Sequence, residues 1–425
     1  MIPLDSHRLK LHKVRKALRL APTLEETRSH TTSKHSVVRH LPIRVVVQQR
    51  ALPKYRIPVF GELAKREGIE LIVVYDALTD GTLNSNAEGL RSKHVPLRIA
   101  SVFGHPVYWH SAQWQYAVGD CCDVVILSWD LHYASLVPAL VRARLNGVPA
   151  ILWGHGYSKR EAAWRKRLRR SVARLATALL FYSSGTAQSF ITSGWDPDRV
   201  YLALNSLDQT PIQQARQCWK KRLPALEAFR EQHDLATGPT ILFVSRLLYE
   251  NRVDLLLRAA AELSLERFRD LTIVLIGSGP DEARLKALAN ELGISARLRM
   301  PGAIYDEVEL APWFLSADVF CYPTNIGLSL LHAFGYGLPV VTSNKVDAQN
   351  PEIEALKDGD NGLLYQDGDP GSLAAALDRV LSDRGLREHM TRQALDTVTS
   401  RFTLSTMVDG MEQAVRFCAH KAAPR

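Results

Sequence analysis

Residues 323–343 read PTNIGLSLLHAFGYGLPVVTS, and the order of elements in this stretch decides the fold. An apolar strand is predicted just before it, and a helix is predicted to begin near Gly327-Leu328-Ser329 and to end at Gly335 or Gly337. Pro339 then opens a second buried strand. Strand, polar loop, helix and strand form one unit of a parallel α/β sheet. The unpaired N–H groups at the start of such a helix favour an anion, typically a phosphate.

The same alternation of short apolar strands and helices runs through most of the chain. In the first half, strands are predicted at 43–47, 69–75, 123–127, 149–153 and 178–182, with helices such as 59–66 and 136–144. In the second half, strands are predicted at 240–244, 271–276, 318–322 and 339–342, with a helix at 254–264. This pattern predicts an α/β protein of two doubly wound, Rossmann-like domains. Ligands are then expected in a cleft between the domains, at the carboxyl ends of the strands.

The domain boundaries follow from where this alternation begins, pauses and ends. Residues 1–42 show little apolar periodicity, which predicts a basic and flexible extension. The passage 206–238 is polar and helical, and it is interpreted as a junction between an N-terminal domain at 43–205 and a C-terminal domain at 239–400. Residues 401–425 are predicted to form a last helix and a tail.

Length and composition favour a large globular protein. The chain has 425 residues, of which 46% are hydrophobic, and a net charge of +9. No run of about 18 apolar residues occurs, so no spanning helix is expected. The basic N-terminus is not followed by an apolar core, so a secretory signal is not expected either. The five cysteines are scattered without CxxC spacing, which favours reduced thiols and a cytoplasmic location.

The positive charge is concentrated in two segments. One is 1–42, and the other is 159–174, where eight Lys and Arg face a single acid, Glu161. In the second segment Trp164, Leu168 and Val172 recur every four residues and place an apolar stripe on one side of a helix. Two interpretations stay open. The helix could contact an anionic membrane, on the inner face of the cytoplasmic membrane, or it could pack Trp164 inward and expose its arginines to water.

Two passages of the second half place chemistry at strand ends. Arg246 directly follows the strand predicted at 240–244, where a guanidinium can hold a diphosphate through two hydrogen bonds. The alternative is a loop arginine paired with a carboxylate. Gly277 and Gly279 end the next strand, and glycines there allow a tight turn and the close approach of a ligand. The glycine signal alone is weak, because many strand–helix turns contain glycine.

These passages, with residues 323–343, resemble the donor site of the retaining glycosyltransferases of family 4. That family has the GT-B fold, in which two Rossmann-like domains face each other across a cleft and a C-terminal helix crosses back to the first domain. The resemblance covers residues 43–420 and is strongest from 243 to 365. It implies transfer of a sugar from a nucleotide-diphosphate sugar to a hydroxyl of a saccharide or lipid-linked acceptor. The associated process would be bacterial cell-surface polysaccharide or glycolipid biosynthesis.

The chain departs from the usual family pattern at three positions. Five residues after the arginine, where the family usually has a lysine, this chain has Asn251, and Arg252 follows it. At the two positions where glutamates usually frame the sugar site, this chain has Thr324 and His332. A variant branch of the family carries histidine at the second of these positions, and residues 350–355 also resemble that branch. His332 is therefore expected to hold the ribose, and the alternative is a helix histidine packed in the core.

The resemblance also implies a set of site residues. The backbone between Gly302 and Tyr305 is expected to meet the nucleobase. The catalytic residues are expected to be Arg246, which stabilises the departing diphosphate, and His155, which faces the donor sugar. The donor-binding set comprises Arg246, Asn251, Arg252, Gly277, Gly279, Ile304, Thr324, Asn325, Gly327, Leu328, Ser329 and His332.

The first half contributes two loops that follow predicted strands. After 43–47, the residues Arg50, Lys54, Tyr55 and Arg56 suggest a basic, aromatic rim for a sugar or lipid-phosphate acceptor. The alternative is a charged loop with Tyr55 packed at a helix start. After 149–153, His155 stands between two glycines, and a loop histidine at a strand end is more often functional than a core histidine.

Metal, cofactor and nucleic-acid functions are not expected. Asp358-Gly-Asp360 and Asp367-Gly-Asp369 match the Asp-x-Asp pattern of metal-dependent glycosyltransferases, but both lie in turn-rich sequence, which explains them better. No nucleic-acid-binding motif accompanies the basic charge. The nucleotide sugar is thus the expected partner, without a metal or cofactor. Two other functions remain open: a nucleotide-sugar epimerase or hydrolase of the same fold, and a non-catalytic nucleotide-sugar-binding protein.

Overall fold

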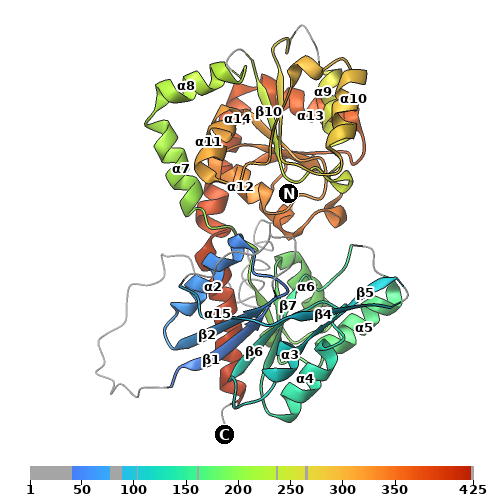
Figure 1. Cartoon of the computed structure of the whole chain (residues 1–425), viewed down its shortest axis with the longest axis vertical. Coiled ribbons are helices and arrows are strands. Elements are labelled where there is room, and N and C mark those ends of the chain that lie inside the picture. The colour runs from blue at the N-terminus through green and yellow to red at the C-terminus, as the bar shows by residue number, and fades with distance from the viewer. Residues whose placement is uncertain are drawn as a thin grey trace, which may run out of the picture. The chain divides into compact units, whose positions relative to one another are not determined.

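The computed structural model describes residues 41–76, 89–102, 104–159, 162–235, 238–263 and 267–422. They form two compact units, drawn in Figure 1. The first unit comprises the described residues up to Leu204 together with those from Leu404 onward, and the second comprises Asn205–Thr403. The predicted extension at 1–42 lies almost wholly outside the described residues. In the part of the chain that is described, no helix is long and apolar enough to cross a membrane.

A parallel sheet forms the centre of the first unit. In the described residues it has seven strands in the order β3-β2-β1-β6-β7-β8-β9. Their bounds are β1 Ile43–Gln48, β2 Ile69–Tyr75, β3 Ser92–His94, β6 Val124–Ser128, β7 Ala150–Gly154, β8 Ala178–Phe181 and β9 Val200–Leu202. The central strands are buried along almost their whole length, as expected for a sheet covered on both faces. A separate antiparallel pair joins β4 (Leu97–Val102) to β5 (His105–His110).

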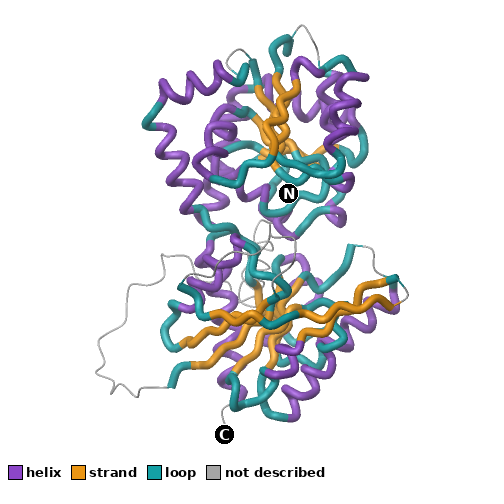
Figure 2. Tube along the Cα trace, in the orientation of Figure 1, coloured by secondary structure: helices purple, strands orange, loops and turns teal. Residues whose placement is uncertain are grey.

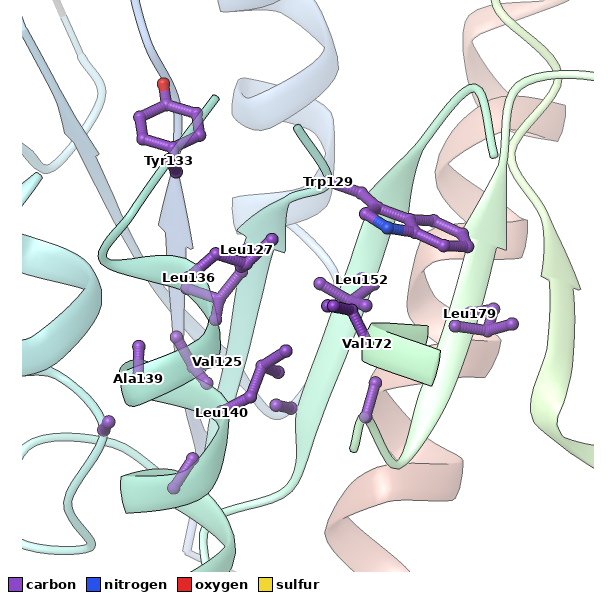
Figure 3. Close-up of a cluster of buried hydrophobic side chains, with 14 of the residues drawn as sticks. Val125, Leu127, Trp129, Tyr133, Leu136, Ala139, Leu140, Leu152, Val172 and Leu179 are labelled. Carbon is purple, nitrogen blue, oxygen red and sulfur yellow. The ribbon is translucent and has the colours of Figure 1, made fainter. Parts of the chain in front are cut away.

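Helices cover both faces of this sheet, as Figure 2 shows in purple and orange. One face carries α3 (Ser111–Gln115), α4 (Leu136–Leu145), α5 (Ala163–Ala173) and α6 (Ser184–Thr192). The other face carries α2 (Ile57–Ala64) and α15 (Leu404–Ala422). Figure 3 shows the packing on the first face, where Leu136 and Leu140 of α4 lie against Val125 and Leu127 of β6.

The second unit is built on a sheet of the same kind. Its described strands are all parallel, in the order β12-β11-β10-β13-β14-β15. Their bounds are β10 Thr240–Val244, β11 Thr272–Ile276, β12 Leu298–Gly302, β13 Val319–Cys321, β14 Val340–Ser343 and β15 Gly362–Tyr365. The chain order reverses between β10 and β13, and such a switch point is where doubly wound sheets bind ligands.

Eight described α-helices surround this second sheet. They are α7 Thr210–Lys220, α8 Leu223–Gln232, α9 Val253–Glu262, α10 Glu282–Glu291, α11 Glu307–Ser316, α12 Ser329–Tyr336, α13 Pro370–Ser382 and α14 Arg384–Asp396. Helices α7 and α8 come from the passage 206–238, which the sequence assigns to a junction, whereas the structure includes them in the second unit.

The α/β fold with two doubly wound sheets is confirmed, and most predicted strands match observed strands to within one residue at either end. The predicted last helix is α15, which follows the second unit in sequence and packs into the core of the first. Its buried side chains include Met407, Val408, Met411, Ala414 and Val415.

Helix α5 corrects one interpretation of the basic segment. Arg169, Val172 and Ala173 are buried, whereas Trp164 is 64% exposed and Leu168 is 46% exposed. The interpretation that Trp164 packs inward is therefore wrong. The four-residue spacing is real, but the helix is rotated so that the face carrying Arg169 and Ala173 meets the sheet.

Candidate functional site

Arg246 lies at the switch point of the second sheet, two residues after the end of β10. The residue is exposed, and its guanidinium forms no hydrogen bond or ion pair with any residue that the structure describes. A cation without a carboxylate partner at such a position is available to an anionic ligand. The alternative interpretation, a loop arginine paired with a carboxylate, is therefore not supported.

The start of α12 lies against the end of β10. Ser329 Oγ is 3.4 Å from the carbonyl oxygen of Val244, which places the first turn of α12 next to the loop that carries Arg246. The backbone N–H groups of Gly327, Leu328 and Ser329 donate no hydrogen bond to another described residue. Three free N–H groups at the positive end of a helix, beside a free guanidinium, form an arrangement suited to a diphosphate.

Side chains from two neighbouring segments, the loop at 349–350 and the end of β15, hold the loop before α12. Ile326 N donates to Gln349 Oε1 at 2.8 Å, and Asn350 Nδ2 donates to Asn325 O at 2.9 Å. Tyr365 donates from its hydroxyl to Pro323 O at 2.9 Å. Asn325 itself has φ +65°, a conformation that a short polar side chain tolerates better than most. The loop is thus held in one conformation before any ligand arrives.

Asn251, at the family's lysine position, joins the two loops of the site. It is only 2% exposed, its Nδ2 donates to Arg246 O at 2.8 Å, and its Oδ1 accepts from Asn325 Nδ2 at 3.3 Å. The expected contact with phosphate is thus replaced by a structural one. The guanidinium of Arg252 is 3.2 Å from Asp254 Oδ1, so its charge is already paired.

The backbone at Gly277 and Gly279 packs against the backbone of the loop that carries Arg246. A Cβ atom on Gly277, which has φ +145°, would lie 1.9 Å from Ser245 O, and one on Gly279 would lie 2.3 Å from Leu247 O. Leu247 N also donates to Ser278 O at 2.9 Å. The close approach that these glycines permit is therefore between two backbone segments, whereas the sequence suggested an approach by a ligand.

The two positions where the family has glutamate have different surroundings. Thr324 Oγ1 is buried and has no hydrogen-bond partner among the described residues. His332 is partly exposed, and its Nε2 lies 2.9 Å from Glu307 Oε1. Tyr336 OH, one helical turn further, donates to the same oxygen at 2.6 Å. Burial raises the pKa of Tyr336, and the adjacent charge of Glu307 raises it further.

Glu307 therefore places a carboxylate beside His332, one of the two positions where the family usually has glutamate. Because a carboxylate only accepts hydrogen bonds, Nε2 of His332 is the donor in this contact, and in the neutral imidazole Nδ1 would then be an acceptor. The His332 ring also packs on Phe314, with ring centroids 4.7 Å apart. These contacts also match the alternative interpretation, in which His332 is a helix histidine that its neighbours in the core satisfy.

The segment expected at the nucleobase follows β12. The backbone N–H and C=O of Ile304 form no hydrogen bond with another described residue, and its side chain is half-buried. Tyr305 next to it is exposed. A free backbone donor and acceptor side by side can pair with the edge of a base.

In the first unit, the predicted basic rim is only partly exposed. Arg50, Lys54 and Tyr55 are exposed, and the Arg50 guanidinium lies 4.7 Å from the centroid of the Tyr108 ring. Arg56 is only 6% exposed, so it does not belong to the predicted exposed rim. Its guanidinium packs over the rings of Trp153 and Tyr182, at 4.9 and 5.1 Å, because a weakly hydrated planar cation stacks well on aromatic faces.

His155 follows β7, and its ring lies 4.9 Å from that of Tyr182. Desolvation and the positive charges of Arg56, Lys159 and Arg169 lower the pKa of His155 to about 4. The imidazole is therefore neutral at neutral pH. Gly156 next to it has φ +69° and packs against the Phe181 ring, a place where any Cβ would collide.

Several residues of these sites escape sequence reasoning. Asp130 and His132 follow β6, next to β1 in the sheet, and His132 Nδ1 lies 2.7 Å from Asp130 Oδ1. The feature of the sequence that could have identified them is their position directly after a predicted strand. Nothing in the sequence indicates the role of Glu307, because it is 25 residues from His332 and this spacing fits no motif.

The Asp-x-Asp pairs form caps and turns. Asp369 accepts from Ser372 N as the N-cap of α13, and Asp358 accepts from Leu364 N at 2.8 Å. Asp360 lies 3.1 Å from His389 Nε2, and Asp367 accepts from Ser343 Oγ. Within the described ranges, no three His, Cys, Asp or Glu residues are grouped closely enough to hold a metal ion.

Residues 226–397, which include the Arg246 loop and α12, match the family model "Glycosyl transferases group 1". The lipopolysaccharide core biosynthesis glycosyltransferase LpsE of Rhizobium meliloti is 25% identical over 42% of this chain and 50% of its own length. An uncharacterized glycosyltransferase of Methanocaldococcus jannaschii is 32% identical over 44% of this chain and 46% of its own length. The chain spans about half the length of the curated relatives that it matches.

Solved structures match over nearly the whole chain. Anabaena Alr3699/HepE in complex with UDP superposes with a TM-score of 0.66 at 15% identity, over 88% of this chain and 99% of that one. At this identity the likeness concerns the fold. The chain therefore has the GT-B fold, and its second unit carries the sequence pattern of the group 1 glycosyl transferases.

Proposed function

We propose that this protein is a retaining glycosyltransferase that uses a nucleotide-diphosphate sugar. The acceptor would be a hydroxyl of a saccharide or a lipid-linked saccharide. The observation that carries the proposal is the juxtaposition of the Arg246 guanidinium with the N–H groups of residues 327–329, none of which has a partner among the residues that the structure describes. Both sit at the switch point of the second sheet, where a diphosphate would be the natural ligand.

Each part of the donor has a matching feature in the second unit. The diphosphate is assigned to Arg246 and the start of α12. The ribose is assigned to His332, which Glu307 holds through Nε2, and the base is assigned to the free backbone of Ile304. A protein of the same fold supports a nucleotide-sugar donor, since HepE crystallised with UDP and, in another crystal, with UDP-glucose. The name of LpsE, lipopolysaccharide core biosynthesis, supports a role in assembly of the cell surface.

In the proposed reaction, the bond between the anomeric carbon and the diphosphate oxygen breaks. The acceptor oxygen forms its bond to the same carbon on the same face, and its proton passes to the departing diphosphate. Negative charge develops on the diphosphate, so positive groups placed there in advance lower the barrier. Arg246 and the N–H groups of 327–329 supply this stabilisation. We propose His155 as a further catalytic residue in a neutral form, and no step of this reaction requires a metal.

The acceptor is assigned to the first unit, where Arg50, Lys54 and Tyr55 are exposed after β1. Cationic and aromatic side chains suit a sugar or a lipid phosphate. Arg56 is assigned a supporting role, because its guanidinium is buried against Trp153 and Tyr182. Replacing Lys54 should therefore affect the KM for the acceptor while leaving donor binding unchanged.

The donor is identified by thermal unfolding of the full chain with UDP-, GDP- and dTDP-sugars. A donor that binds the folded state raises Tm, by mass action. Product analysis with saccharide and lipid-linked acceptors then tests the reaction, and the proposal predicts a glycoside whose anomeric configuration matches that of the donor. Hydrolysis or epimerisation that no acceptor changes would favour the epimerase or hydrolase function. Binding without turnover of any donor would favour a non-catalytic protein.

A further inference from the structure

The outer surface of helices α3, α4 and α5 in the first unit is apolar and basic at once. These three helices cover one face of the sheet, and Figure 1 shows them on the same side of the unit. On α4, Leu136, Ala139 and Leu140 point to the strands in Figure 3. The opposite side of α4 exposes Val137, Val141 and Leu145, which recur every four residues, and Leu145 is 82% exposed.

Helix α5 continues this surface. Trp164 and Leu168 are exposed on it, and so are Lys166 and Arg167. Helices α4 and α5 are successive crossovers between the neighbouring strands β6, β7 and β8, so they lie next to each other on the sheet. On the α3 side, the Arg142 guanidinium of α4 lies 4.3 Å from the centroid of the exposed Trp114 ring.

The charge of this surface has one sign. None of the three helices contains an aspartate or a glutamate, whereas α4 and α5 together carry arginines and a lysine along their length. Beside this surface, residues at the C-terminal ends of α4 and α5 line a pocket of about 260 Å³, next to the beginnings of β7 and β8. Its basic lining residues come from four separate elements: Arg144, Arg174, Arg199 and Lys421.

We infer that the outer surface of α3, α4 and α5 binds an anionic lipid bilayer. Exposed tryptophans and aliphatic side chains on a basic helix are the features of interfacial helices, and tryptophan favours the headgroup region. Each basic residue near anionic lipid adds attraction of about 1 kcal/mol. An acidic patch on a protein partner would pair with the basic side chains. It would not provide the broad apolar region of a bilayer, which can take up the apolar side chains of all three helices at once.

The inference goes beyond the proposed function, and it is tested without measuring sugar transfer. The full chain is sedimented with vesicles of phosphatidylcholine, with and without about one third phosphatidylglycerol. Lys166→Glu/Arg167→Glu and Trp164→Ser/Leu168→Ser should each bind the anionic vesicles at least about tenfold more weakly than the unchanged chain. The matched control, Arg258→Glu/Arg269→Glu, reverses two exposed charges in the second unit and should bind as the unchanged chain does.

A second readout locates the contact. Lipids brominated in the acyl chain should quench the tryptophan fluorescence of the bound protein, and the quenching should fall in Trp164→Phe. Circular dichroism and Tm confirm that the variants fold. The inference is overturned if the unchanged chain ignores anionic vesicles, or if the α5 variants bind as tightly as the control variant. Quenching that Trp164→Phe leaves unaltered would likewise overturn the assignment of this surface.

Discussion

At the scale of single residues, the pairing of His332 with Glu307 places a carboxylate beside a position where the family usually has glutamate. His332 and Tyr336 lie one turn apart on α12, and both contact the same oxygen of Glu307, the first residue of α11. The carboxylate fixes the imidazole in one orientation with Nδ1 as acceptor. A ribose hydroxyl can then donate to a pre-oriented nitrogen, where the usual family site offers a glutamate oxygen.

Glu307→Gln tests this pairing. The amide can still accept one hydrogen bond, but it loses the charge and leaves His332 with a freer ring. We expect the KM for the donor to rise several-fold while kcat changes less, together with a loss of about 1 kcal/mol in the free energy of unfolding. Steady-state kinetics and urea unfolding measure the two effects. Glu309→Gln, exposed on the same helix, is the control. Equal donor KM values in both variants would contradict the assigned role.

His110 makes the stability of the first unit depend on pH. It has no exposed surface, and neither ring nitrogen has a hydrogen-bond partner among the described residues. Desolvation lowers its pKa to about 4, from the ordinary 6.5. Between pH 6.5 and about pH 4, His110 therefore binds a proton in the unfolded chain but stays neutral in the folded chain. The free energy of unfolding falls as the pH is lowered through this range.

His110→Gln should remove this pH dependence. Between pH 7 and pH 5, the unchanged chain should lose about 2 kcal/mol of unfolding free energy through His110 alone. In the variant this part of the loss should be absent, whatever the cost of the substitution at pH 7. Urea unfolding at the two pH values measures it, and His105→Gln, which is exposed, is the control. The same pH difference in all three proteins would show that His110 is not responsible.

At the scale of elements, the site depends on two loops that touch backbone to backbone. Gly277→Ala would place a methyl group 1.9 Å from Ser245 O and would also require φ +145° from an alanine. We expect a loss of more than about 2 kcal/mol in stability, with weaker donor binding because the Arg246 loop is displaced. Gly385→Ala in α14, which meets only ordinary contacts, is the control. A Gly277→Ala protein that is as stable as the control would refute this packing argument.

The elements that sequence reasoning finds are those with strong apolar runs. Strands such as β2 and β10 are almost continuously apolar, and their ends are predicted correctly. The β4–β5 pair is missed because its residues are largely exposed and mix polar with apolar side chains. The orientation of α5 is missed for a related reason, since a stripe at helical spacing does not say which side meets the sheet.

The same distinction applies to the candidate site. Arg246 and the start of α12 are predictable, because each follows a recognisable strand in a short, local motif. The roles of Asn251 and Glu307 are not, because they depend on partners in other loops, Asn325 and His332, that only the folded chain brings near. Likewise, the position of Gly277 is predictable, but its backbone neighbour is not.

At the scale of the whole molecule, α15 makes the first unit depend on residues that follow the second in sequence. Met411→Ala should cost about 2–4 kcal/mol, because Met411 is fully buried in the core against the sheet. Urea unfolding followed by fluorescence measures this loss, and Gln413→Ala, which is only partly buried, is the control. An unchanged unfolding free energy in Met411→Ala would mean that α15 adds little to the first unit.

The central claim is that Arg246 and the start of α12 bind the diphosphate of a sugar donor. Titration calorimetry of the full chain with the donor found in the thermal panel tests it most directly, with the Arg246→Ala variant. We predict binding that is weaker by roughly 10- to 150-fold, from the loss of one charge-assisted contact, with an unchanged Tm in the absence of donor. Arg258→Ala, which removes another exposed arginine of the second unit, should bind normally. Unaltered donor affinity and turnover in Arg246→Ala would contradict the claim.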